Sequence, residues 1–217
     1  MSTLNHPTTI DTVVFDLGNV LIRWNPRNLY RKIFGDDVQA METFLTEVCP
    51  PEWNERQDAG RSWQEGIDEA IARHPSQEAL IRAYRERWEE TLGGVLEETV
   101  LILEELHAKG VRLLALTNWS AETFPIALQR FPFLHTFEGI LVSGAEGIIK
   151  PAPAIFQLLK SRYRFEGNHA VFIDDHLPNV EGARREGFNA LQFTSATQLR
   201  KDLAALGLPV QALSEPA

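Results

Sequence analysis

Short hydrophobic runs alternate with longer amphipathic stretches over most of this chain. Residues 12–15 are apolar or β-branched on both faces and end directly at Asp16, a pattern typical of a fully buried strand. The same pattern predicts further strands at 111–116, 139–143, 170–173 and 190–193. Helical patterns follow these strands, at 96–109, 121–130, 152–162, 178–186 and 195–206. Alternating strands and helices favour parallel strands with right-handed crossovers, so we predict a doubly wound α/β core.

Strand-like runs disappear between about residues 26 and 94, where helical periodicity replaces them. Ser62 and Glu65 have the spacing of a capping box and predict a helix that runs to about residue 73. Ser76 is a candidate cap for a second helix, whose apolar side chains fall on one face. We therefore predict a core formed by residues 1–25 and 95–217, with an α-helical domain at 26–94 inserted into it.

The composition narrows the range of partners and compartments. A length of 217 residues is enough for a sizeable core and a smaller second unit. Lys and Arg number 21 against 30 Asp and Glu, a net charge of −9 that argues against nucleic acid and anionic membranes as partners. Cys49 is the only cysteine, which excludes an intramolecular disulfide and a cysteine-cage zinc site. The first 16 residues lack the features of a signal peptide, so we expect a cytoplasmic protein.

Polar residues gather where the predicted strands end and just before one predicted helix. These residues are Asp16, Thr117, Asn118, Lys150, Asp174 and Asp175. Ligands of doubly wound sheets bind beyond the carboxyl ends of the strands, so we expect these side chains to converge. Three carboxylates in one crevice are costly unless they share a cation, and oxygen ligands favour Mg²⁺. Asp16 and Asp175 are the expected metal ligands, while Lys150 and Thr117 would hold an anion against the metal.

Four segments carry a family resemblance: 15–20 (FDLGNV), 116–118 (LTN), 150–151 (KP) and 172–175 (FIDD). Together and in this order they resemble the motifs of the haloacid dehalogenase (HAD) superfamily, most of whose members are phosphatases. The resemblance covers nearly the whole chain, and the helical insertion looks like the family's cap domain. It implies a Rossmann-like HAD core and Mg²⁺-dependent hydrolysis of a small phosphorylated metabolite.

The resemblance also implies a role for each residue at the metal. Asp16 would be the nucleophile that forms an aspartyl-phosphate. Asp175 would be a direct metal ligand, Asp174 a partial or indirect one, and Gly18 would offer its backbone carbonyl. Asn179, at the start of the next predicted helix, would orient metal-bound waters.

The remaining roles concern the phosphate and the leaving group. Thr117 and the Asn118 N–H would hold phosphate oxygens, and Lys150 would neutralise Asp16 and the developing charge. One departure stands out: many family phosphatases carry a second aspartate two residues after the nucleophile, as general acid/base, where this chain has Gly18. A subgroup with the turn Asp-Leu-Gly-Asn is similar and includes sugar-phosphate phosphatases.

Two other functions remain open at this point. In a 2-haloacid dehalogenase, Asp16 would attack carbon, although Asp174 and Asp175 argue against an anionic haloacid without a cation. In a degenerate binding protein the fold would remain without turnover, which the glycine at position 18 suggests. The sequence leaves monomer and homodimer equally open.

Several further side chains are candidates for contact with the substrate or for a structural role. A substrate-facing and a structural role are equally open for Trp24 and Trp119, whereas Trp63 and Trp88 are predicted to pack inside the helical insertion. Arg23 and Arg56 are candidate substrate contacts, although a surface role is favoured for both. His176 is expected at the site rim without a catalytic role, and Cys49 is expected to be inert.

Overall fold

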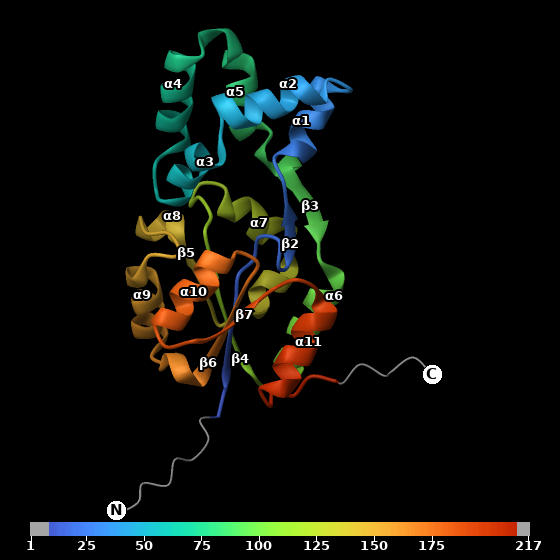
Figure 1. Cartoon of the computed structure of the whole chain (residues 1–217), viewed down its shortest axis with the longest axis vertical. Helices are drawn as coiled ribbons and strands as arrows, with labels where there is room; N and C mark the ends of the chain where they lie inside the picture. The colour runs from blue at the N-terminus through green and yellow to red at the C-terminus, as the bar shows by residue number, and fades with distance from the viewer. Residues whose placement is uncertain (1–8, 212–217) are drawn as a thin grey trace, which may run out of the picture.

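Five parallel strands form the central sheet of the computed structural model, which describes residues 9–211 (Figure 1). They are β1 (Thr12–Phe15), β4 (Arg112–Thr117), β5 (Gly139–Val142), β6 (Ala170–Asp174) and β7 (Asn189–Gln192). Their order in the sheet is β5-β4-β1-β6-β7, so β1 pairs with β4 on one side and with β6 on the other. Every residue of β1 and β6 is buried, in agreement with their apolar sequences.

Helices cover both faces of this sheet, which confirms the predicted doubly wound α/β core. They are α6 (Glu97–Ala108), α7 (Phe124–Arg130), α9 (Pro153–Tyr163), α10 (Leu177–Arg185) and α11 (Ala196–Ala205). Val13 and Phe15 belong to the hydrophobic cluster that includes α6, α7 and α11. Val14, pointing to the opposite face, packs with α9 and α10. Alternate residues of one buried strand thus stabilise two helical layers.

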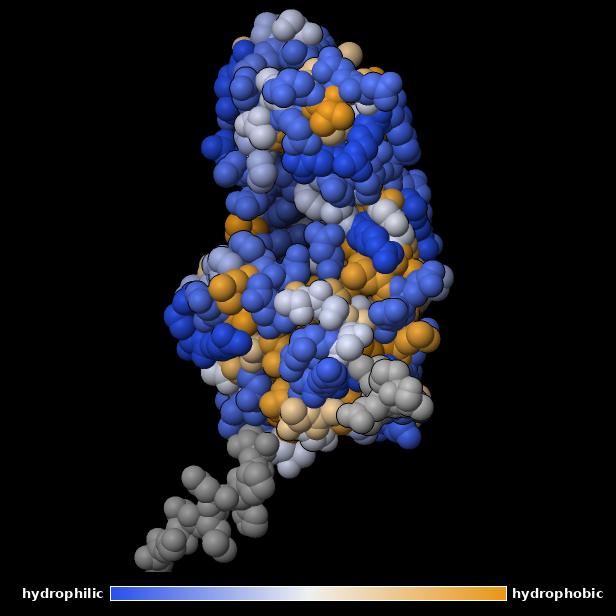
Figure 2. Space-filling model, turned by 45° about the vertical axis from the view of Figure 1, so that its right-hand side comes forward, coloured by the Kyte–Doolittle hydropathy of each residue, from blue (hydrophilic) through white to orange (hydrophobic). Residues whose placement is uncertain are grey.

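Five further helices lie between β1 and α6. They are α1 (Arg27–Phe34), α2 (Val38–Thr43), α3 (Pro51–Asp58), α4 (Trp63–Arg73) and α5 (Glu78–Glu86). A π-type turn at Phe44–Val48 and 3₁₀ turns at Pro75–Gln77 and Trp88–Thr91 complete this helical block, defined here as residues 27–91. In Figure 1 the block lies beyond the carboxyl ends of the strands, and Figure 2 shows an indentation of hydrophilic residues below it.

The start of α4 follows the sequence prediction, whereas three other local predictions are wrong. Ser62 and Glu65 form both hydrogen bonds of the capping box. Ser76 caps no helix, because it lies in a 3₁₀ turn and α5 begins at Glu78. Ser143, the last residue predicted for the third core strand, instead begins a short helix, α8 (Ser143–Glu146). Helix α7 begins at Phe124 rather than at residue 121.

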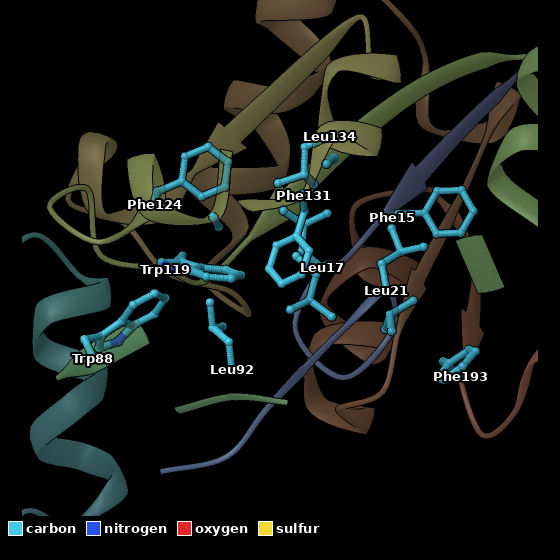
Figure 3. Close-up of a cluster of buried hydrophobic side chains, with 14 of the residues drawn as sticks. Phe15, Leu17, Leu21, Trp88, Leu92, Trp119, Phe124, Phe131, Leu134 and Phe193 are labelled. Carbon is cyan, nitrogen blue, oxygen red and sulfur yellow. The ribbon is translucent and has the colours of Figure 1, made fainter. Parts of the chain in front are cut away.

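A two-stranded antiparallel ribbon connects the helical block to the sheet. Its strands are β2 (Ile22–Trp24) and β3 (Leu92–Val95). The prediction that strand-like structure is absent from residues 26–94 is therefore wrong at 92–94. The pairing partner of β3 is about seventy positions away in sequence, and two glycines give no local strand signal. The hydrophobic cluster in Figure 3 is continuous from Phe15 to Leu92 and Trp88 beside this ribbon.

Across residues 9–211, none of the helices combines the length and the apolar character that crossing a membrane would require. The prediction that the first 16 residues are not a signal peptide falls partly on residues 1–8, which lie outside the described part of the chain.

Gly144 at the start of α8 allows a close approach of two backbone segments and gives a first testable prediction. A Cβ there would lie 2.5 Å from Ala121 N and 2.7 Å from Trp119 O. We expect Gly144→Ala to lower the free energy of unfolding by about 1–3 kcal/mol, because neither backbone can move freely. Urea unfolding followed by circular dichroism measures this. Gly18→Ala is the control, since a Cβ at Gly18 meets no atom of residues 9–211 within 4 Å. Equal stability of the two variants would contradict the packing argument.

Candidate active site

Lys150 lies at the centre of a buried charged cluster at the carboxyl ends of the strands. Its Nζ is 2.9 Å from Asp16 Oδ1 and 2.7 Å from Asp174 Oδ2, and it donates to Leu116 O at 3.0 Å. Asp16 follows β1 and Asp174 ends β6, and these strands are neighbours in the sheet. One carboxylate oxygen from each of Asp16, Asp174 and Asp175 lies within 4.8 Å of the others. Parallel pairing therefore brings together side chains that are about 160 positions apart.

Asp174 is fully buried and receives hydrogen bonds on both oxygens. Oδ1 accepts from the His176 N–H at 2.8 Å and from Asn179 Nδ2 at 3.1 Å. Oδ2 accepts from Asn179 Nδ2 at 3.1 Å and from Lys150. The Asn179 amide thus fixes a carboxylate directly, a contact that the sequence analysis did not anticipate. His176 is exposed at the rim and contributes through its backbone.

The cluster holds more carboxylates than cations, and the pKa values reflect this imbalance. Burial raises the pKa of Asp16 from 3.8 to about 7; Lys150 opposes this rise, whereas Asp174 and Asp175 add to it. Burial also raises the pKa of Asp175, as does its neighbour Asp174. Burial would lower the pKa of Lys150, but Asp16 and Asp174 raise it above its usual value. Three carboxyl groups around one ammonium fit an additional cation.

Thr117 and Asn118 form the other side of the cluster. Thr117 Oγ1 is buried and has no hydrogen-bond partner within residues 9–211, so it can donate to a ligand oxygen. The Asn118 side chain accepts from Lys150 N at 2.8 Å and donates to Lys150 O at 3.1 Å. The sequence analysis assigned a task to the backbone of Asn118 but not to its side chain, which holds the loop carrying Lys150.

Two adjoining cavities open next to these residues. The smaller, of about 80 Å³, is lined by Gly18, Trp24, Asn54, Asp58, Trp88, Asn118, Trp119 and Thr123. The larger, of about 320 Å³, extends between α1, α3 and α5 of the helical block. Trp24, Asn54, Asp58 and Asn118 line both. A ligand whose head lies beside Gly18 and Asn118 can therefore extend into the helical block.

The tryptophans divide between the cavities and the interior. Trp24 and Trp119 line the smaller cavity. Trp63 is buried in the helical block as predicted, with Nε1 donating to Ser120 Oγ at 3.1 Å. Trp88, also predicted to pack inside the insertion, lines the cavity as well and lies against Trp119, with ring centroids 5.5 Å apart (Figure 3).

The other candidate side chains lie away from the cluster or are unreactive. Arg23 is exposed and donates to Val95 O, and Arg56 pairs with Glu69 at 3.1 Å on the surface. Cys49 borders the larger cavity, and burial raises the pKa of its thiol to about 12. A thiol with so high a pKa is a poor nucleophile at neutral pH.

Asn54 and Asp58 border both cavities, and the sequence analysis missed them. Both come from α3, one helical turn apart, and Asn54 Nδ2 donates to Asp58 Oδ2 at 3.0 Å. The sequence offered little signal, because α3 (PEWNERQD) has no apolar periodicity that would mark a buried face, and the burial of Asn54 and Gln57 is visible only in the structure.

The chain combines a doubly wound sheet, a helical block after the first strand and a charged cluster at the carboxyl edge of the sheet. This combination is typical of one class of α/β hydrolases. The family model for haloacid dehalogenase-like hydrolases matches residues 10–187, and the chain belongs to this family. A sesquiterpene phosphatase of Aspergillus oryzae is 25% identical over 204 residues, which are 92% of this chain and 97% of that protein.

Two solved structures illustrate the shared fold. A HAD-like hydrolase of Porphyromonas gingivalis aligns with a TM-score of 0.71 and 23% identity, covering 94% of this chain and all of that one. A HAD family enzyme of Bacteroides thetaiotaomicron, in complex with magnesium and inorganic phosphate, aligns with a TM-score of 0.64 and 18% identity. The alignment covers 86% of this chain and 95% of that one. At these identities the structures establish the fold alone.

Proposed function

We propose that this hydrolase is a Mg²⁺-dependent phosphatase that cleaves a small phosphomonoester through an aspartyl-phosphate on Asp16. The observation that carries the proposal is the buried contact of Lys150 with Asp16 and Asp174 beside the orphaned hydroxyl of Thr117. The activity named for the Aspergillus oryzae relative and the ligands of the Bacteroides thetaiotaomicron enzyme support it.

The donor set at the cluster fits Mg²⁺. The carboxylates of Asp16 and Asp175 and the backbone oxygen of Gly18 would hold the ion, with Asp174 as a partial or indirect ligand; hard oxygen donors suit this cation. When bound, the ion neutralises negative charge and polarises the phosphate oxygens. The surplus of carboxylates over ammonium groups is the physical reason for a cation here.

The chain's own residues divide the remaining work. Asp16 attacks phosphorus, and the bond to the leaving oxygen breaks; water then hydrolyses the acyl phosphate. Lys150 neutralises Asp16 and the charge that develops on the phosphoryl group. Thr117 Oγ1 and the Asn118 N–H donate to phosphate oxygens. The Asn118 side chain holds the backbone of Lys150 in place.

The domain division is part of the proposal. Residues 26–94 would act as a cap over a core of residues 1–25 and 95–217, of which 1–8 and 212–217 lie outside the described chain. The larger cavity within the helical block supports this, because it would receive the alcohol part of the substrate. A sugar phosphate as substrate, a cytoplasmic location and a monomeric or homodimeric state stay predictions.

The acidic cluster disfavours the dehalogenase alternative. A 2-haloacid is itself a carboxylate, and Asp174 and Asp175 beside Asp16 would repel it. A phosphate ester accompanied by a divalent cation meets no such penalty.

Metal removal tests the proposal. We expect p-nitrophenyl phosphate hydrolysis to disappear with chelator and to return with Mg²⁺. Asp175→Ala is expected to lower the rate by about 100-fold or more, because several kcal/mol of charge stabilisation would be lost. It should also lose the rise in melting temperature that Mg²⁺ gives the wild type, because an ion bound only to the folded state stabilises it.

Asp36→Ala, an exposed aspartate of the helical block, is the control and should behave as the wild type. Halide release from 2-chloropropionate in chelator, with no phosphatase activity, would overturn the proposal in favour of the dehalogenase.

A further inference from the structure

Asp58 is a carboxylic acid that faces the same cavity as Gly18. Position 18 has no side chain, and so the leaving-group oxygen lacks a proton donor there. The roughly 80 Å³ cavity is bordered by Gly18 and Asn118 on the core side and by Asn54 and Asp58 on the helical block. Asp58 borders both cavities, so a substrate whose phosphorus is beside Asp16 and whose alcohol part enters the larger cavity would extend alongside it.

The position of Asp58 is fixed from both sides of the cavity. Its carboxylate Oδ2 accepts from Asn54 Nδ2 at 3.0 Å within α3. Its backbone carbonyl accepts from Ser143 Oγ at 2.6 Å, and the same hydroxyl accepts from the Trp119 N–H at 2.9 Å. The last residue of α3 is thus bonded to the core loop after β4 and to the start of α8. Such contacts hold a catalytic group within reach of a substrate atom.

The surroundings of Asp58 favour its protonated form. Burial raises the pKa of this carboxyl to about 7; Glu55 and Asp16 add to the rise, whereas the Ser120 N–H opposes it. Arg27 borders the larger cavity, but its guanidinium is paired with Glu42 at 2.6 Å. A carboxyl whose pKa is close to neutrality is suited to giving and taking a proton.

We propose that Asp58 is the general acid of the reaction and supplies the proton that a residue at position 18 cannot. The inference rests on the proposed phosphatase function. As Asp16 forms its bond to phosphorus, the bond from phosphorus to the leaving oxygen breaks, and that oxygen keeps the electron pair. The Asp58 carboxyl proton moves to this oxygen, and an alcohol leaves. The resulting Asp58 carboxylate then takes a proton from the water that attacks the aspartyl-phosphate.

Leaving-group dependence tests the assignment. Asp58→Asn is expected to lower kcat for phenyl and alkyl phosphates by about 10²–10⁴-fold, the usual contribution of general acid catalysis. The loss for p-nitrophenyl phosphate should be less than about tenfold, because p-nitrophenolate leaves without a proton. Glu52→Gln makes a similar change at an exposed position of α3 and should leave every rate unchanged. An equal loss for all esters in folded Asp58→Asn would overturn the inference.

A second variant keeps the test independent of how well Asp58→Asn folds. Gly18→Asp places a carboxyl in the same cavity, and a Cβ at Gly18 meets no atom of the described residues within 4 Å. It should restore part of the lost phenyl phosphate turnover in Asp58→Asn but add little to the wild type. If Gly18→Asp alone greatly raised phenyl phosphate turnover, the wild type would lack a general acid, and this would contradict the role of Asp58. Absence of all phosphate ester hydrolysis in the wild type would instead overturn the proposed function.

Discussion

Asp16→Asn is expected to abolish phosphatase turnover and to leave the protein folded. A neutral amide is a poor nucleophile and cannot form the acyl phosphate, so kcat should fall by about 10³-fold or more. The fold should persist, because Lys150 keeps its contacts with Asp174 Oδ2 and Leu116 O. The variant also removes a buried carboxyl whose pKa is raised by burial, which spares the folded state the cost of ionising it.

The measurement is single-turnover hydrolysis of p-nitrophenyl phosphate, together with urea unfolding. Asp11→Asn is the matched control, because Asp11 is exposed and lies just before the other end of β1. It should retain wild-type activity. Near-normal hydrolysis by folded Asp16→Asn would contradict the mechanism at its central step.

Lys150→Met is expected to give the largest loss of stability among the variants considered. It removes the ammonium that contacts both Asp16 and Asp174 and leaves these two buried carboxyl groups facing each other. Removing one partner of a buried ion pair lowers the free energy of unfolding by about 3–5 kcal/mol, because the charge of the other partner is left uncompensated. Turnover should also be lost, since the same ammonium neutralises the phosphoryl group.

The loss of stability should depend on pH. A carboxyl whose pKa is higher in the folded than in the unfolded protein favours the fold in its protonated form. This contribution is fully present below the pKa of the unfolded state and is lost as the pH rises through the pKa of the folded state. For Asp16 this window runs from 3.8 to about 7 in the wild type, and without Lys150 the upper limit moves higher. The difference between variant and wild type should therefore be larger at about pH 8 than at about pH 5.

Urea unfolding in the presence of chelator, at both pH values, measures this difference. Lys32→Met is the control: Lys32 is exposed and pairs with Glu90 at 2.8 Å on the surface, so its loss should cost less than about 1 kcal/mol. If Lys150→Met were as stable as the wild type at the higher pH, the Lys150 ammonium would not be the group that compensates the buried carboxylates.

The local sequence was sufficient to predict an element where the interactions that form it lie within a few residues. The strand at 12–15 is apolar on both faces, a pattern typical of a strand buried between two layers. The capping box at Ser62 is likewise formed by residues three positions apart. In contrast, β3 exists because Leu92–Val95 pairs with Ile22–Trp24, and nothing in its own four residues indicates this partner.

The same distinction applies to the site. The sequence by itself determined which chemical groups end the core strands, because each follows an apolar run: Asp16 after β1 and Asp174 in β6. Only the tertiary structure decided what these groups contact. Sheet order places Asp16 beside Asp174, and the loop before α9 brings Lys150 to both carboxylates. The packing of α3 against the core places Asp58 at the same cavity as Gly18. Contacts between residues far apart in sequence depend on how the elements pack, which local patterns do not encode.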